Sequence, residues 1–197
     1  MPWPLQLQGL DPYLIRFPVA APPSFPIMVH TAEAPTRTES PALHEPQAWR
    51  VEVFRRAEMP DPEGEHALAA LSELGFPPLE ALRTGRGTLL SPSYSRDVVE
   101  EIATAFLADP VVNEVRIYAP EEAPPSREGT HRVLVMPRPG VMDPVARTVE
   151  DLLARTAHLP SEGAPGVATF RIFEVHGSVA AEELARAARR VWANETI

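Results

Sequence analysis

Histidines and carboxylates are the side chains of this sequence that could bind a metal or carry out acid–base chemistry. A metal site needs three or four converging ligands, and no two histidines form an HxxxH pair, so we interpret them as surface or loop residues. The histidines are His30, His44, His66, His131, His158 and His176. Several carboxylates could pair for catalysis, but their places in first turns and on polar faces of expected helices favour interaction with the helix dipole. These carboxylates are Glu63, Glu65, Asp97, Glu100, Glu101, Glu182 and Glu183.

Nucleophiles and phosphate-binding loops have no clear sequence signal. The chain contains no cysteine, and therefore no cysteine nucleophile, disulfide or thiolate metal site. No serine lies in a GxSxG context. The run Gly85-Arg86-Gly87 lacks the GxxxxGK[ST] spacing of a phosphate loop, and the chain has no lysine. We predict no catalytic, cofactor-binding or metal-binding residue in this chain.

Two arginines, Arg83 and Arg86, flank Gly85 in an expected turn. One interpretation is an exposed loop, Arg83 to Arg86 including Thr84, that contacts a protein partner or a phosphate. The other, which we favour, is a solvated hairpin tip. In either case the turn joins two strand-like runs, 79–83 and 88–90, into a hairpin.

Composition limits the classes of function. The net charge of -9 disfavours nucleic-acid binding, because an acidic chain repels phosphate backbones. No run approaches the length of a membrane span, and no secretory signal is evident, so a cytoplasmic protein is expected. Ten of the 24 prolines fall in residues 1–48. Proline disfavours continuous helix and sheet, so this stretch is expected to be an extended or disordered tail.

An Asp-Pro pair, at Asp61-Pro62 and Asp143-Pro144, occurs twice between a strand-like and a helix-like run. Aspartate is a good N-cap and proline suits the first helical position. The first unit, 49–118, reads as β-α-β-β-α-β, with Gly75 ending its first helix. A linker, 119–131, leads to a second unit, 132–197.

The second unit follows the same order but has no closing strand after its last helix. We therefore expect the front part of a longer polypeptide or a truncated reading frame. Its first strand is apolar on both faces, which predicts that Leu134 and Met136 pack against a partner of the same fold. Trp192 is expected in the core or as an anchor between the units. The predicted fold class is α+β: two tandem two-layer units forming a pseudo-dimer.

The first unit contains four short motifs in order: Asp61-Pro62-Glu63-Gly64, Leu74-Gly75, Arg83-Thr84-Gly85-Arg86 and Leu107-Ala108-Asp109-Pro110-Val111-Val112. These motifs resemble those of the small subunit of phosphoribosylformylglycinamidine synthase. The runs 139–146 and 193–197 are similar to the second half-module found at the N-terminus of fused, single-chain synthases. The second unit departs from the pattern, because Thr169-Phe170-Arg171 lacks the Thr-Gly turn.

The resemblance implies a non-catalytic module of an ATP- and glutamine-dependent ligase of de novo purine synthesis. Such a module joins the synthetase to the glutaminase and helps ammonia pass between them. ATP and magnesium would bind the synthetase region, not this chain. A stand-alone tandem α/β module that binds a small effector or dimerises is the alternative. An enzyme with its site between the units is least favoured, because no convergent nucleophile, base or metal set is visible.

Overall fold

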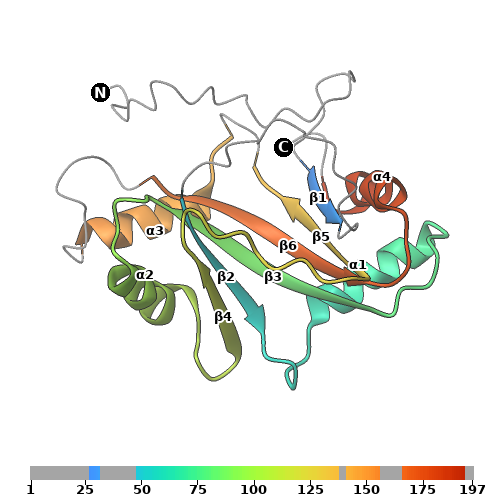
Figure 1. Ribbon diagram of the computed structural model, residues 1–197, viewed down its shortest axis with the longest axis horizontal. Helices are drawn as coiled ribbons and strands as arrows, with labels where there is room; N and C mark the ends of the chain where they lie inside the picture. Colours follow the sequence, from blue (N-terminus) through green and yellow to red (C-terminus); the bar gives the residue numbers. More distant parts are fainter. Residues whose placement is uncertain (1–26, 32–47, 138–140, 156–165, 194–197) are drawn as a thin grey trace.

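One antiparallel sheet of six strands organises the computed structural model, which describes residues 27–31, 48–137, 141–155 and 166–193. The strand order is β1-β5-β6-β3-β2-β4 (Figure 1). The strands are β1 (Ile27–Thr31), β2 (Trp49–Arg55), β3 (Ala81–Leu90), β4 (Asn113–Tyr118), β5 (Thr130–Val135) and β6 (Ala168–His176). The helices are α1 (Pro62–Glu73), α2 (Arg96–Ile102) with a π-helical turn η1 (Ala103–Leu107), α3 (Pro144–Arg155) and α4 (Ala181–Val191).

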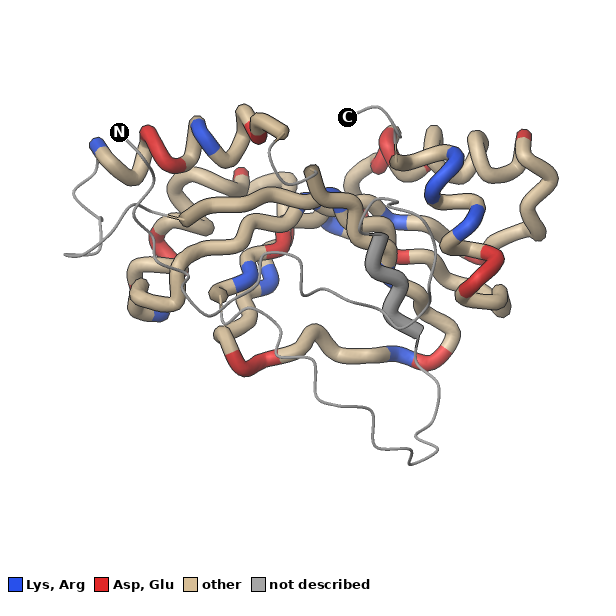
Figure 2. The backbone as a smooth tube through the Cα atoms, turned by 90° about the horizontal axis from the view of Figure 1, so that it is seen from above, with Lys and Arg blue, Asp and Glu red and all other residues tan. Residues whose placement is uncertain are grey.

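The helices pack on one face of the sheet in two pairs. Helices α1 and α4 share a core with the β3, β5 and β6 side chains Leu82, Val133 and Phe173. Helices α2 and α3 share a second core around β2. Each core thus draws on both the first half of the chain (residues 49–118) and the second half (residues 130–193). The segment 119–129 runs across the opposite face of the sheet (Figure 2). The predicted α+β, two-layer fold class is confirmed.

The predicted hairpin is wrong, because β3 runs without a break through Gly85 and Gly87. Neither glycine has a positive φ, and both are paired in the sheet with β2 on one side and β6 on the other. Aromatic rings from the adjacent strands lie over them instead: a Cβ on Gly85 would come 2.6 Å from the ring of Phe54, and one on Gly87 would overlap the ring of Phe170. Glycine in a strand often marks such a close approach. The order of the first half is therefore β-α-β-α-β.

The expected disordered tail contains one strand, β1, and its other residues lie outside the described part except for residue 48. Strand β1 pairs with β5 in the same antiparallel way as β4 pairs with β2. In the strand register, His30 is opposite Arg132, and Tyr118 is opposite Arg50. No strand follows α4 in the described residues, and 194–197 lie outside them. Strand β1 thus occupies the place beside β5 that β4 occupies beside β2.

Candidate functional site

The N-terminus of α1 is tied to the central strand β3 by Asp61. Its Oδ1 accepts hydrogen bonds from the Gly64 N–H at 2.9 Å and the Thr84 hydroxyl at 2.7 Å. Its Oδ2 accepts one from the Thr84 N–H at 2.6 Å. A Cβ on Gly64 would come 2.6 Å from that same Oδ2, so a side chain there would disturb the contact. Asp61 therefore acts both as the predicted helix cap and as a brace between layers.

The second half contains the same brace. Asp143 accepts hydrogen bonds from the Ala146 N–H at 2.9 Å, the Thr169 N–H at 3.0 Å and the Thr169 hydroxyl at 2.7 Å. The second half lacks the Thr-Gly pair of the first. Thr169 nevertheless keeps the contact with the aspartate, while Phe170 stands where the first half has Gly85.

Arg86 and Arg171 face each other at the centre of the molecule. They are register partners on β3 and β6, and both are exposed on the helix-bearing face. Arg171 donates from Nε (3.0 Å) and Nη2 (2.5 Å) to Glu63 Oε1 on α1. No described carboxylate forms an ion pair with Arg86. Like charges directly opposite each other on one face of a sheet are destabilising. The carboxylate of Glu63 balances one of the two positive charges, so the other is left without compensation.

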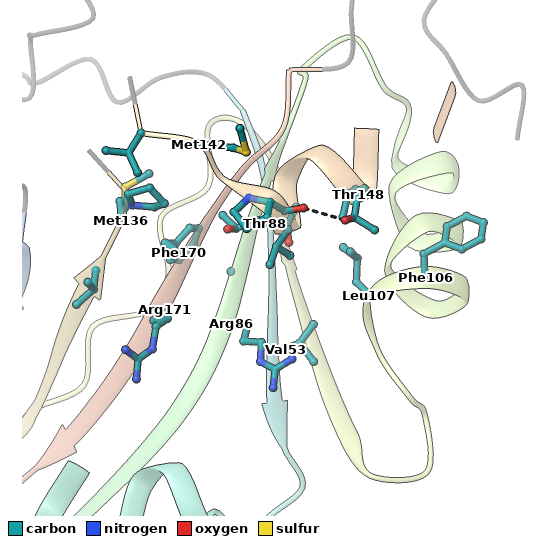
Figure 3. A pocket seen from close by; sticks show the side chains of 18 of the residues that line it. Val53, Arg86, Thr88, Phe106, Leu107, Met136, Met142, Thr148, Phe170 and Arg171 are labelled. Atoms are coloured by element: carbon teal, nitrogen blue, oxygen red, sulfur yellow. Dashed lines mark hydrogen bonds between the residues drawn. The ribbon is translucent and has the colours of Figure 1, made fainter. Parts of the chain in front are cut away.

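A groove of about 820 Å³ lies over this arginine pair, between the two helix pairs. Its apolar lining includes Val53 of β2, Leu107 of η1 and Val145 of α3. Figure 3 shows Arg86 and Arg171 toward one end of the groove and Met142 toward the other. Met142 is 81% exposed and Val145 is 59% exposed. The groove thus combines a cationic end with an apolar rim.

The residues predicted for an interface lie in different surroundings. Arg86 and Met136 both line the groove. Arg83 lies on the opposite face of β3, where it donates to the Arg55 carbonyl at 2.7 Å. The other four are structural in this chain: Thr84 binds Asp61, Gly85 lies under Phe54, Leu134 is buried in an apolar cluster, and Trp192 stacks on Phe173 with ring centroids 4.1 Å apart.

A buried ion network, which the sequence reading missed, lies on the face opposite the groove. The Glu52 carboxylate, whose side chain is fully buried, contacts Arg50 at 2.6 Å and Arg132 at 2.5 Å. Arg132 also lies 3.2 Å from Glu174, and Arg116 lies 2.8 Å from Glu174. The network therefore connects β2, β4, β5 and β6. Its sequence signal is the alternation of these charged residues with apolar residues on each strand.

The outer part of the network shifts nearby pKa values. Partial burial acts to raise the pKa of Glu114, but the hydrogen bond and charge of Arg116 and the charge of Arg83 outweigh it, so that this pKa lies below its ordinary value. Burial, followed by the negative charge of Glu52, raises the pKa of Tyr118. The shifts arise from ion pairing and burial on a sheet face, and the two arginines favour the charged form of Glu114.

Within the described ranges, no group of three or more histidine, aspartate or glutamate side chains is placed to hold a metal ion. No helix there is long and apolar enough to cross a membrane. The geometry consists of braces, an ion network and a groove with one cationic end. Such an arrangement suits a module that binds another molecule.

The structure has a two-layer α+β fold with a groove, and comparison with known proteins finds a match to part of the chain. Residues 48–121 match the PurS family model, described as phosphoribosylformylglycinamidine (FGAM) synthase. This match supports an FGAM synthase small-subunit-like module that extends from β2 through β4. The match covers less than half of the chain. No curated protein and no solved structure matched it.

Proposed function

We propose that this chain is a non-catalytic assembly module of FGAM synthase, joining the ATP-dependent synthetase to the glutaminase. The observation that carries this proposal is the family match over residues 48–121. The site supports it, because the groove offers a binding surface while the charged residues of the opposite face are engaged with one another. ATP and magnesium would bind the synthetase region.

We propose further that the second half is a second copy of the same module, so that the chain is a tandem pseudo-dimer. The braces Asp61–Thr84 and Asp143–Thr169 support this, since each ties a helix N-terminus to a central strand. The register supports it as well: Arg86 and Arg171 follow the two threonines by the same two positions and face each other. A twofold axis through this pair would relate the halves.

The role in ammonia transfer follows from the chemistry of such a ligase. Ammonia released by the glutaminase would be protonated and lost in open water. Holding the two active components in one closed assembly avoids this loss and raises the effective concentration of ammonia at the synthetase. A rigid module that contacts both components would contribute by positioning them.

The test is reconstitution of FGAM synthase from purified components with and without this chain. Binding to the synthetase and glutaminase is measured by isothermal titration calorimetry, and FGAM formation is measured with glutamine or with ammonium chloride as nitrogen source. The proposal predicts binding, a requirement for the chain with glutamine, and little dependence on it with ammonium chloride. Absence of binding to both components would contradict it.

The rival function, a stand-alone module that binds a small effector, draws support from the groove alone. Its volume lies within the range usual for small-molecule sites. It predicts that the chain binds neither component and that a small ligand protects it from thermal unfolding.

A further inference from the structure

We infer that the groove over Arg86 and Arg171 binds an acidic segment of a protein component of FGAM synthase, flanked by apolar side chains. This inference rests on the proposed function, because it takes the partner to be a component of that enzyme. It adds the chemistry of the contact: a carboxylate at the arginine end and apolar side chains along the rim.

The charge balance of the groove argues for an anionic partner. Arg86 and Arg171 project from directly opposed positions on the same face, and Glu63 binds Arg171 through two donor nitrogens. One positive charge therefore remains, in a chain whose net charge is -9. An external carboxylate beside Arg86 would complete the pairing, and arginine is suited to bind it through two parallel hydrogen bonds.

The exposed apolar rim argues for a protein partner over a small ion. Val141, Met142 and Val145 are 36%, 81% and 59% exposed, and all three line the groove. Contiguous exposed apolar side chains mark protein contact sites. A free phosphate or a small carboxylate would satisfy Arg86 and leave these side chains in water. An acidic residue followed by apolar residues would use both ends of the groove seen in Figure 3.

The experiment measures binding of the full chain to the purified synthetase and to the purified glutaminase, each by calorimetry. Arg86→Ala is expected to weaken binding to one component by about tenfold or more, since it removes one partner of a charge pair. Met142→Ser is expected to weaken it by about three- to tenfold. The control is Arg189→Ala, an exposed arginine on α4, which should change affinity by less than about twofold.

Glu63→Gln provides a test that distinguishes a role of the groove in binding from a purely structural role. It removes the carboxylate paired with Arg171 and so raises the positive charge of the groove. Binding of the same component should become about threefold tighter or more, and the gain should diminish as salt is added. Unchanged or weaker binding by Glu63→Gln would count against the inference.

The remaining outcomes separate this inference from the proposed function. If the unaltered chain binds a component and the Arg86, Met142 and Glu63 variants bind equally well, the groove is not the contact and only this inference fails. If the unaltered chain binds neither component, the proposed function fails as well. Inorganic phosphate and acetate serve as small-anion probes: submillimolar binding of either, lost in Arg86→Ala while component binding is kept, would make the groove a small-anion site and overturn the inference.

Discussion

The two halves of the molecule share a brace but differ at a buried strand position. Both braces use an aspartate that caps a helix and accepts two hydrogen bonds from a threonine. Two residues after Arg50, β2 carries the buried Glu52; two residues after Arg132, β5 carries the buried Leu134. Glu52 binds both arginines. The Glu52 carboxylate thus contacts an arginine of each half, so the network joins the halves instead of stabilising each separately.

The largest effect is expected from removing that shared carboxylate. Glu52→Ala removes the buried carboxylate that contacts both Arg50 and Arg132, and breaking a buried pair costs about 3–5 kcal/mol of unfolding free energy. Chemical denaturation would measure the loss. Glu121→Ala in the exposed segment after β4 is the control, with an expected change within about 0.5 kcal/mol. A similar small change in Glu52→Ala would show that the halves do not depend on this carboxylate.

The braces allow a direct test of equivalence. Asp61→Ala and Asp143→Ala each remove a helix cap and two further hydrogen bonds, and each should cost about 2–4 kcal/mol. Thr84→Val and Thr169→Val remove only the hydroxyl bond and should cost about 1 kcal/mol each. Thermal or chemical unfolding would measure all four. A large loss of unfolding free energy in one half with almost none in the other would show that the two braces are not equivalent.

The central strands differ in side-chain size, and this difference predicts a smaller effect. Gly87 of β3 faces Phe170 of β6, whose ring lies over it. Gly87→Ala forces the ring to move within an apolar cluster, at an expected cost of about 1–3 kcal/mol. The check is the free energy of unfolding of Gly87→Ala, of Phe170→Leu and of the double variant. If the ring clash is the cause, the costs of the two single variants are not additive in the double variant.

The smallest effect concerns pH and the outer strand β4. The pKa of Glu114 in the folded chain lies below its ordinary value of 4.5. Its contribution to stability is therefore present above pH 4.5 and is lost as the pH falls from there through the folded pKa. Glu114→Gln should be less stable than the unaltered chain at pH 7 and should lose less stability on acidification. Identical pH profiles by thermal unfolding would contradict the shift.

Local capping signals predicted where α1 begins and ends. Asp61 accepts a hydrogen bond from the first turn of α1, and Gly75 follows α1 with a φ of 74°. These features depend on neighbours in the sequence, so periodicity and residue type reveal them. The two-layer fold followed from the same local patterns.

Features that depend on neighbouring strands could not be predicted in this way. Gly85 and Gly87 suggested a turn, because nothing local shows that rings from other strands lie over them. Arg83 and Arg86 were grouped in one loop, whereas in a continuous strand residues three apart point to opposite faces. The ion network was missed because Arg132 and Glu52 meet only once the sheet has formed.

Strand β1 covers the edge of the sheet that β5 would otherwise form. At one edge of the sheet, residues 27–31 engage the outward N–H and C=O groups that β5 would otherwise present to solvent. A bare edge is a template for strands of other chains. Deleting the first 47 residues should therefore promote aggregation by intermolecular strand pairing, even though the deletion leaves every residue of the braces and of the groove in place.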